Sequence, residues 1–349
     1  FTGHHDTWHY GVMDNGSANA TMIEVARICA MQRDQWRRGL RLCFWSGHSH
    51  GRYSGSTWYA DHHWDELERR CVAHVNIDST GGKGATVLTD ALTSSELRAL
   101  GREAVGTQGG QQLVGLRMSR AGDQSFWGVG LPSMFMGMGE QPAGSGVDVT
   151  ASILGSAGGR KGAGFGWWWH TPDDTIDKID PVLLVRDARI YVHALWHLLH
   201  DPVVRLDYGQ WAADFLAELG KLNAALSGRF DLGPLLARAE ALRSKAAALR
   251  ERAQHAADDA ECAALNTALM RVSRALVPID YTSGDRFGHD PALGQSAWPP
   301  LDPIRRLAAA AAGSEEAKFM AVAAVRARNR IAHPLDQAIA AIDRGLVRA

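Results

Sequence analysis

The sequence lacks the features that mark membrane-spanning and nucleic-acid-binding proteins. No apolar run in its 349 residues approaches the roughly 20 residues that a bilayer-spanning helix needs, so we predict no membrane span. There is no block of like charge, and the formal net charge is only −1. Nucleic acids and anionic membranes bind proteins through basic patches, so we expect neither kind of partner.

Cysteine is also scarce. The four cysteines include no CxxC pair and are scattered along the chain at Cys29, Cys43, Cys71 and Cys262. This scatter argues against a disulfide framework or a cysteine metal site, and it predicts buried thiols in a reducing compartment. We therefore expect a cytoplasmic protein, with a targeting segment upstream of the sequence left open as an alternative.

The sequence does not begin with methionine. Phe1 is separated by one residue from Gly3-His4-His5-Asp6, a segment dense in chemically active side chains. A polypeptide rarely begins in the middle of its own site. We therefore expect that upstream sequence was removed or lies on a separate chain.

Histidine and tryptophan, by contrast, are abundant. The chain contains 15 histidines and 12 tryptophans, within a composition of 46% hydrophobic and 21% charged residues that is ordinary for a globular protein. The histidines crowd the first 75 residues. This asymmetry indicates that the chemistry lies in the N-terminal part of the chain.

Residues 1–200 alternate between helical and strand-like patterns. Such alternation predicts an α/β domain with a mostly parallel sheet and helices on both sides. Helices are expected at 21–31, 56–70, 94–104 and 181–199, and strands at 40–45, 71–77, 112–118 and 131–136.

Beyond Asp201 the strand signal stops. Apolar residues then recur at alternating spacings of four and three, which predicts helices packed side by side. We expect an all-helical domain over residues 201–349, with a long connection at 280–303 and helical faces at 235–253, 265–276 and 323–342.

Several polar residues follow predicted strands directly. Asp78 ends one strand, His48 and His50 follow another, and His4 and Asp6 follow Phe1-Thr2. Functional residues of parallel sheets gather past the carboxyl ends of the strands. Because neutral imidazole and carboxylate are suitable ligands for Zn²⁺, a zinc site is predicted at this edge.

Residues 3–17 resemble the metal-site signature of the zinc aminopeptidase superfamily, above all the branch of glutamate carboxypeptidase II and the transferrin receptor. Four further blocks resemble that branch in the same order along the chain. They comprise residues 44–47 with 55–56, residues 76–78, residues 122–126 with 130–132, and residues 169–175. The resemblance implies a zinc peptidase-like core, then a helical dimerisation-type domain through which the protein would dimerise, and it leaves out the region upstream of the core. We expect a second chain to supply that region.

The resemblance also implies roles for individual residues. His4 and Asp78 would hold one zinc ion, Asp14 would bridge to a second ion, and His170 would belong to that second ion. Asp6 would orient His4 as part of the catalytic machinery. The peptide bond between Asp14 and its successor, Asn15, would be cis.

The sequence departs from this family at one place. Where the family has two adjacent glutamates, a general base and a zinc ligand, the chain has His48 and Ser49, followed by His50. Three interpretations stay open. His48 acts as base while His48 or His50 replaces the ligand; a single zinc binds through His4, Asp14 and Asp78; or the site is catalytically dead, as in the transferrin receptor.

The leading functional prediction is a zinc-dependent hydrolase that cleaves an amide or peptide-like bond in a small substrate through a metal-activated water. The alternatives are a mononuclear zinc acyl-transferring cyclase and a non-catalytic binding protein of the transferrin-receptor type. Two smaller questions also stay open. The run 167–169 would line a substrate pocket or shield the metal, and Asp173 and Asp174 would orient His170 or cap a helix at Thr175.

Overall fold

The computed structural model describes residues 1–118, 124–135, 137–144 and 161–348. The chain divides into two compact units. Unit 1 comprises Phe1–Phe126, Pro132–Asp201 and Asp290–Gly294, and unit 2 comprises Trp127–Leu131, Pro202–His289 and Gln295–Ala349. Part of the fourth block of resemblance, Gly122 and Asp123, lies outside the described residues.

Short parallel strands form the centre of unit 1. Strand β1 (Thr2–His4) pairs in parallel with β2 (Cys43–Trp45), and β3 (His74–Val75) pairs in parallel with β4 (Ser133–Met134). A parallel bridge between Thr2 and Asn76 joins β1 to the chain just after β3. The carboxyl ends of β1 and β2 therefore lie at the same edge, with His4 opposite Trp45.

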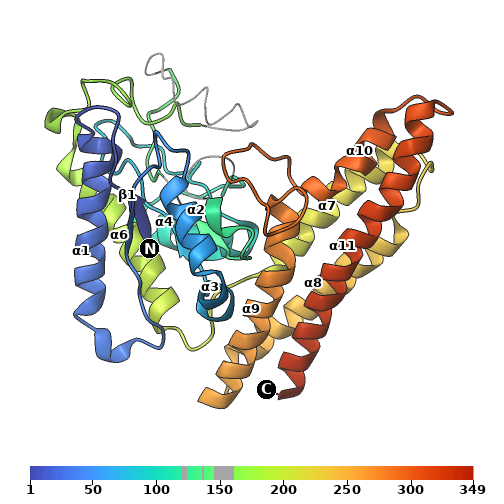
Figure 1. Cartoon of the computed structure of the whole chain (residues 1–349). Helices are drawn as coiled ribbons and strands as arrows, with labels where there is room; N and C mark the ends of the chain where they lie inside the picture. Colours follow the sequence, from blue (N-terminus) through green and yellow to red (C-terminus); the bar gives the residue numbers. More distant parts are fainter. Residues whose placement is uncertain (119–123, 136, 145–160, 349) are drawn as a thin grey trace. The chain divides into compact units, whose positions relative to one another are not determined.

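Helices flank these strands, which confirms the predicted α/β class. Figure 1 shows α1 to the left of β1 and α2 to its right, and both α1 and α4 pack against α6. The helices of unit 1 are α1 (Ala18–Ala30), α2 (Ser54–His62), α3 (Trp64–Arg70), α4 (Arg98–Gly109) and α6 (Pro181–His200). Single turns occur at η1 (Val12–Ser17), η2 (Arg33–Gln35), η3 (Ser95–Leu97), η4 (Gln124–Phe126) and η5 (Ile176–Lys178).

Helix α6 begins as its sequence predicts. Pro181 stands at the first helical position, where its missing N–H costs nothing. The Asp180 carboxylate caps the helix by accepting hydrogen bonds from Val182 N and Leu183 N at 2.8 and 3.3 Å.

Two predicted elements of unit 1 are wrong in detail. The helix expected at 56–70 is broken at His63, whose φ of −115° and ψ of 19° lie outside the helical region. The strand expected at 112–118 is reduced to a single bridge between Leu92 and Leu116. Gly115 has a φ of 73° there, and this left-handed conformation interrupts the extended backbone that a ladder requires.

The regular secondary structure in the described residues of unit 2 consists of helices. Its helices are α7 (Tyr208–Leu226), α8 (Gly233–Gln254), α9 (Asp259–Tyr281), α10 (Asp302–Ala309) and α11 (Glu315–Arg348), with one turn at η6 (Pro299–Leu301). Helix α11 packs against α8 and α9, and α7 packs against α8. The predicted apolar faces are buried, as Leu235 and Leu249 of α8 and Leu265 and Leu276 of α9 show. The connection after α9 ends where Trp298 packs edge-on to Trp211.

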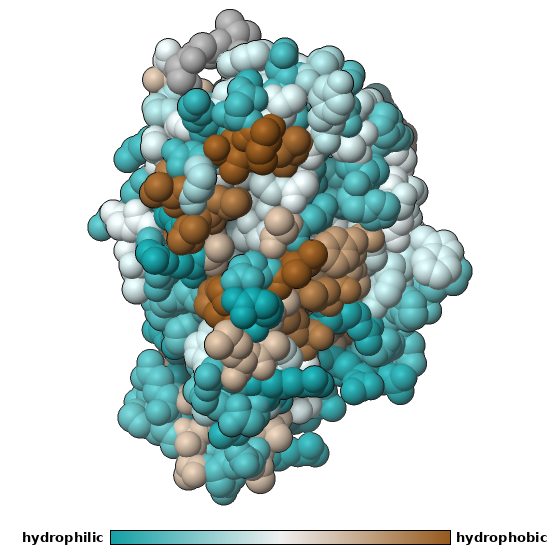
Figure 2. Space-filling model, turned by 90° about the vertical axis from the view of Figure 1, so that its left-hand side faces the viewer, coloured by the Kyte–Doolittle hydropathy of each residue, from teal (hydrophilic) through white to brown (hydrophobic). Residues whose placement is uncertain are grey.

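The surface of unit 1 carries several exposed apolar side chains. Examples are Ile23 and Met31 on α1, and Val182 and Val185 on α6. Figure 2, viewed from the side of α1, shows apolar patches set among hydrophilic residues. Among the residues that the structure describes, no helix is long and apolar enough to cross a membrane.

Candidate metal centre

Two carboxylates meet one histidine at the ends of the parallel strands. His4, the last residue of β1, places its Nε2 3.0 Å from Asp14 Oδ1 and 3.3 Å from Asp78 Oδ2. Asp78 lies two residues beyond the bridge that Asn76 makes to Thr2. The convergence follows from the topology, because neighbouring parallel strands end at the same edge.

Asp14 contacts a second histidine through its other oxygen. Asp14 Oδ2 lies 2.8 Å from His170 Nε2, so each oxygen of this buried carboxylate faces a different imidazole. Two metal ions bridged by one carboxylate need this arrangement. The structure thus brings His4, Asp14, Asp78 and His170 together.

The segment that carries Asp14 is fixed by its neighbour Asn15. The Asn15 amide donates to His4 O and Ile77 O at 3.2 and 3.3 Å, and its oxygen accepts from Ser79 N at 3.1 Å. The Asp14–Asn15 peptide bond is cis, which confirms the prediction.

The distances and the donor set fit zinc. Ligand atoms about 2.0–2.1 Å from a tetrahedral zinc lie about 3.3 Å from one another, close to the 3.0 and 3.3 Å measured around His4 Nε2. His4 Nε2 and Asp14 Oδ1 are buried, and neither makes a hydrogen bond with any residue that the structure describes. A buried polar atom without a hydrogen bond is costly, and a positive ion held by this close pair would satisfy both atoms.

The pKa shifts of His4 and Asp14 also favour a bound cation. Burial by itself lowers the pKa of His4, but the charges of Asp78 and the contacts with Asp14 raise it well above its usual range. Burial raises the pKa of Asp14, and the contacts with His170 and His4 reverse this and hold it well below its usual range. The Asp14 carboxylate therefore stays ionised and favours a positive charge beside it.

Asp6 joins His4 to the loop that carries His48. Its backbone oxygen accepts a hydrogen bond from His4 Nδ1 at 2.8 Å, whereas its carboxylate lies 3.7 Å from that nitrogen. The carboxylate instead accepts from His48 N at 3.2 Å and from Ser49 N at 2.9 Å. Burial raises the pKa of Asp6, but His4 and these two N–H groups lower it well below its usual range.

The His48 ring lies beside the candidate ligands. It stacks on His4 with ring centroids 4.0 Å apart and planes 3° from parallel. Its Nε2 is 4.0 Å from Asp78 Oδ2, and ligand atoms of His4, His48 and Asp78 all lie within 4.8 Å of one another. His48 therefore stands where it can contact either a metal ion or a water molecule next to one.

His50 lies apart from this cluster. Its side chain is exposed, and its Nε2 is 3.3 Å from Thr7 O. Its ring centroid is 4.2 Å from that of Trp8, which in turn is 5.5 Å from that of His170.

The tryptophans before His170 differ in environment. Trp169 stacks on His170 with centroids 3.2 Å apart, and Trp168 is buried with its Nε1 donating to Met13 Sδ at 3.3 Å. Trp167 is 57% exposed. Of the three tryptophans, Trp167 is the most accessible to a molecule in solvent.

Asp174 has a role that the sequence did not indicate. Its buried carboxylate accepts hydrogen bonds from Met13 N at 2.8 Å and from Asp14 N at 3.0 Å. It therefore fixes the backbone of Asp14 and does not cap a helix. Asp173 is exposed. The separation of 160 residues leaves no local pattern that would have revealed this contact.

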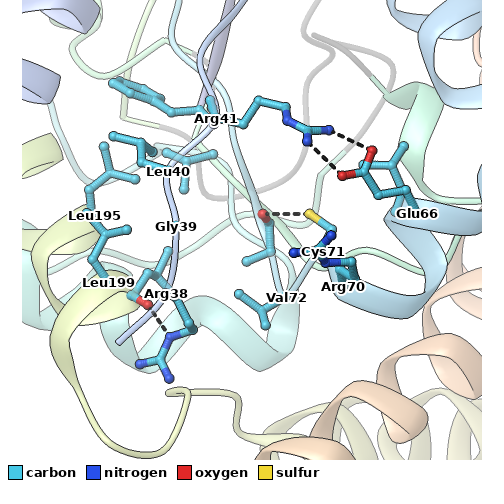
Figure 3. A pocket seen from close by; sticks show the side chains of 15 residues that line it. Arg38, Gly39, Leu40, Arg41, Glu66, Arg70, Cys71, Val72, Leu195 and Leu199 are labelled. Atoms are coloured by element: carbon cyan, nitrogen blue, oxygen red, sulfur yellow. Dashed lines mark hydrogen bonds and ion pairs between the residues drawn. The ribbon is translucent and has the colours of Figure 1, made fainter. Parts of the chain in front are cut away.

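One cavity among the described residues of unit 1 lies apart from this centre. It has a volume of about 320 Å³ and is lined by Phe1 and by residues such as Arg38, Arg41, Cys71 and Leu199. Figure 3 shows its polar rim, where Arg41 pairs with Glu66. None of the candidate ligands lines this cavity.

Comparison with known proteins agrees with this geometry. The model of Peptidase family M28 matches residues 1–195, more than half of the chain. The chain belongs to peptidase family M28. The resemblance to the zinc aminopeptidase superfamily is thereby confirmed.

Curated proteins and solved structures are also similar to parts of this chain. A probable glutamate carboxypeptidase of Arabidopsis thaliana is 25% identical over 329 residues, which cover 85% of this chain and 43% of that protein. An aminopeptidase of Mus musculus is 28% identical over 91 residues, covering 25% of this chain and 12% of that protein. A zinc aminopeptidase from Bacillus subtilis has a TM-score of 0.43 and 21% identity, covering 57% of this chain and 45% of that one. The chain thus spans less than half of the length of these curated relatives.

Proposed function

We propose that this chain carries the metal centre of a zinc-dependent hydrolase that cleaves an amide or peptide-like bond. One observation carries the proposal, namely that the two oxygens of Asp14 face the imidazoles of His4 and His170 at 3.0 and 2.8 Å. In this proposal His4 and Asp78 hold one zinc ion, His170 holds the second, and Asp14 bridges them. Bound zinc would supply an activated water and stabilise the oxyanion of the tetrahedral intermediate.

His48 takes the part of the general base in this proposal. Its imidazole is stacked on His4 and its Nε2 lies 4.0 Å from Asp78 Oδ2, so it can accept a proton from a water held at the ligands. Imidazole is suited to this task near neutral pH. Asp6 positions the base through its hydrogen bonds to the backbone of His48 and Ser49.

The substrate class follows from the relatives and the surroundings of the centre. The relatives are named as a carboxypeptidase and an aminopeptidase, so we propose a small peptide or peptide-like amide. Two exposed tryptophans lie near His170, since Trp8 is in ring contact with it and Trp167 precedes it by three residues. Both offer aromatic surface to such a substrate. We further propose, as the resemblance implies, that unit 2 mediates dimerisation and that a further polypeptide segment completes the catalytic core.

A centre with one zinc ion is the second candidate. The grouping of His4, His48 and Asp78 within 4.8 Å provides three ligands without the bridging residue, and it matches the three protein ligands of many catalytic zinc sites. In that arrangement His48 would be a ligand and not a base, and a zinc acyl-transferring cyclase would become the matching activity.

The experiment combines metal counting with activity. The purified chain is loaded with zinc, and its ion content is compared with that of the His170→Ala and His48→Ala variants, while hydrolysis of a panel of dipeptides and aminoacyl amides is measured. The proposal expects the His170→Ala variant to lose one ion. It expects His48→Ala to keep its ions and lose about 10²–10⁴-fold in rate.

Three results would contradict the proposal. Loss of an ion in His48→Ala would make His48 a ligand and favour the one-zinc candidate. Full activity in His48→Ala, with unchanged ion content, would remove His48 as the base. A chain that binds no zinc at all would support the binding-protein alternative.

A further inference from the structure

A second group of metal-ligating side chains lies on the packed pair of helices α4 and α6. Glu103 Oε1 is 3.1 Å from His193 Nε2 and 3.4 Å from His197 Nε2. Ligand atoms of all three residues lie within 4.8 Å of one another. These residues belong to unit 1, but none of them takes part in the centre at His4.

The helical geometry explains why the three side chains meet. His193 and His197 are one turn apart on α6, so both imidazoles project from the same face. Helix α4 packs against α6 and brings Glu103 to that face. The imidazoles are 13% and 21% exposed and the carboxylate 44% exposed, so the group is set into the surface but open to ions from solvent.

The separations match those around a zinc ion. Ligand atoms on a tetrahedral zinc are about 3.3 Å apart, and the two Glu103 distances, 3.1 and 3.4 Å, bracket this value. Two imidazoles and one carboxylate form a ligand set that zinc commonly takes, with the fourth position left to water. The exposed side of Glu103 leaves room for that water.

The outer nitrogens of both imidazoles are held by polar groups. His197 Nδ1 lies 3.1 and 3.0 Å from the two oxygens of Asp201. His193 Nδ1 lies 3.4 Å from Gln108 Nε2. A carboxylate on Nδ1 of His197 fixes the tautomer whose Nε2 lone pair is directed outward, and ligand histidines are characteristically supported in this way. The Gln108 amide nitrogen only donates, so His193 Nε2 would bind a metal once that amide turns and its oxygen accepts from His193 Nδ1.

The carboxylates around His197 favour a positive charge at this site. Glu103 and Asp201 place carboxylates on opposite nitrogens of one imidazole. A proton on Nε2 or a divalent ion in its place would satisfy both carboxylates.

We propose that Glu103, His193 and His197 form a binding site for a divalent transition metal, with zinc the best-suited ion. The bound ion would fasten α4 to α6. Helix α6 also carries Asp187, whose buried carboxylate accepts a hydrogen bond from Gly81 N at 2.9 Å. The ion would therefore stabilise the fold of unit 1 without taking part in hydrolysis, and the proposal does not depend on the function assigned to the His4 centre.

The test counts ions and measures stability on the full chain. Metal-free protein is titrated with zinc chloride by calorimetry, and thermal unfolding is recorded with and without zinc. The variants are the double change His193→Ala/His197→Ala and the milder Glu103→Gln. The matched control is His200→Ala, because His200 lies on the same helix and contacts Asp201 at 3.6 Å without facing Glu103.

The proposal expects the double variant to bind one ion fewer than wild type and to lose the matching part of the zinc-induced rise in unfolding temperature. Glu103→Gln should weaken this site at least about tenfold, and His200→Ala should behave as wild type. If the double variant and Glu103→Gln both bind as many ions as wild type with unchanged affinity, the site does not exist. Should the double variant fail to fold, Glu103→Gln decides alone.

Discussion

Replacing Asp174 by asparagine removes one of the two hydrogen-bond acceptors that hold the backbone of Met13 and Asp14. In wild type the two Asp174 oxygens accept from Met13 N and Asp14 N at 2.8 and 3.0 Å. Asparagine keeps one oxygen and replaces the other with an amino group, which cannot accept. One buried N–H is then left without a partner and faces another donor.

The magnitude follows from that lost hydrogen bond. An unsatisfied buried donor costs about 1–3 kcal/mol, which corresponds to roughly 5–150-fold in an equilibrium constant. Part of this cost will appear as lower stability of the metal-free fold. The rest will appear as weaker zinc binding, because Asp14 is no longer held in position; supporting residues of metal ligands typically contribute 10–100-fold.

The assay measures zinc affinity by competition with a chelator and stability by urea unfolding of metal-free protein. Asp173→Asn is the matched control, since it makes the same chemical change one residue away at an exposed position. We expect Asp174→Asn to bind zinc at least tenfold more weakly than Asp173→Asn. Equal zinc affinity and equal stability in the two variants would refute the role given to Asp174.

Three further predictions concern stability and the histidine loop. Burial raises the pKa of the Cys29 thiol to about 11, so the folded chain keeps a proton that the unfolded chain loses above pH 9. The free energy of unfolding should therefore fall as the pH rises, by about 1 kcal/mol at pH 10. Urea unfolding measured at several pH values should show that this pH dependence is absent in Cys29→Ala. Phe215 of α7 is fully buried, and Phe215→Ala should cost about 3–5 kcal/mol of unfolding free energy while leaving the zinc content unchanged; a cost below 1 kcal/mol in urea would contradict the packing described. His50→Ala should change the zinc content and the hydrolysis rate by less than twofold, because His50 faces Thr7 O and not the carboxylates, and loss of an ion would show that it is a ligand after all.

Much of the fold follows from local patterns in the sequence. The buried faces of α8 and α9 repeat every three or four residues, and Pro181 with Asp180 marks the start of α6. The failures have local causes that hydrophobic periodicity does not register. Gly115 interrupts a predicted strand with a positive φ, and the backbone at His63 breaks a predicted helix.

The candidate centre was predictable in part. Strand ends alone bring His4 and Asp78 to one edge, but nothing local relates them to His170, which only the family resemblance brought into the set. Asp174 and the group on α4 and α6 were not predicted. Their contacts depend on the packing of segments that lie far apart in sequence, as the 90 residues between Glu103 and His193 illustrate.

A crystal structure of the zinc-loaded chain, with ions located by anomalous scattering at the zinc edge, tests the central claim most directly. The account predicts one peak in contact with His4, Asp78 and Asp14, and a second in contact with His170 and the other oxygen of Asp14. The absence of any zinc peak in contact with Asp14 would contradict it.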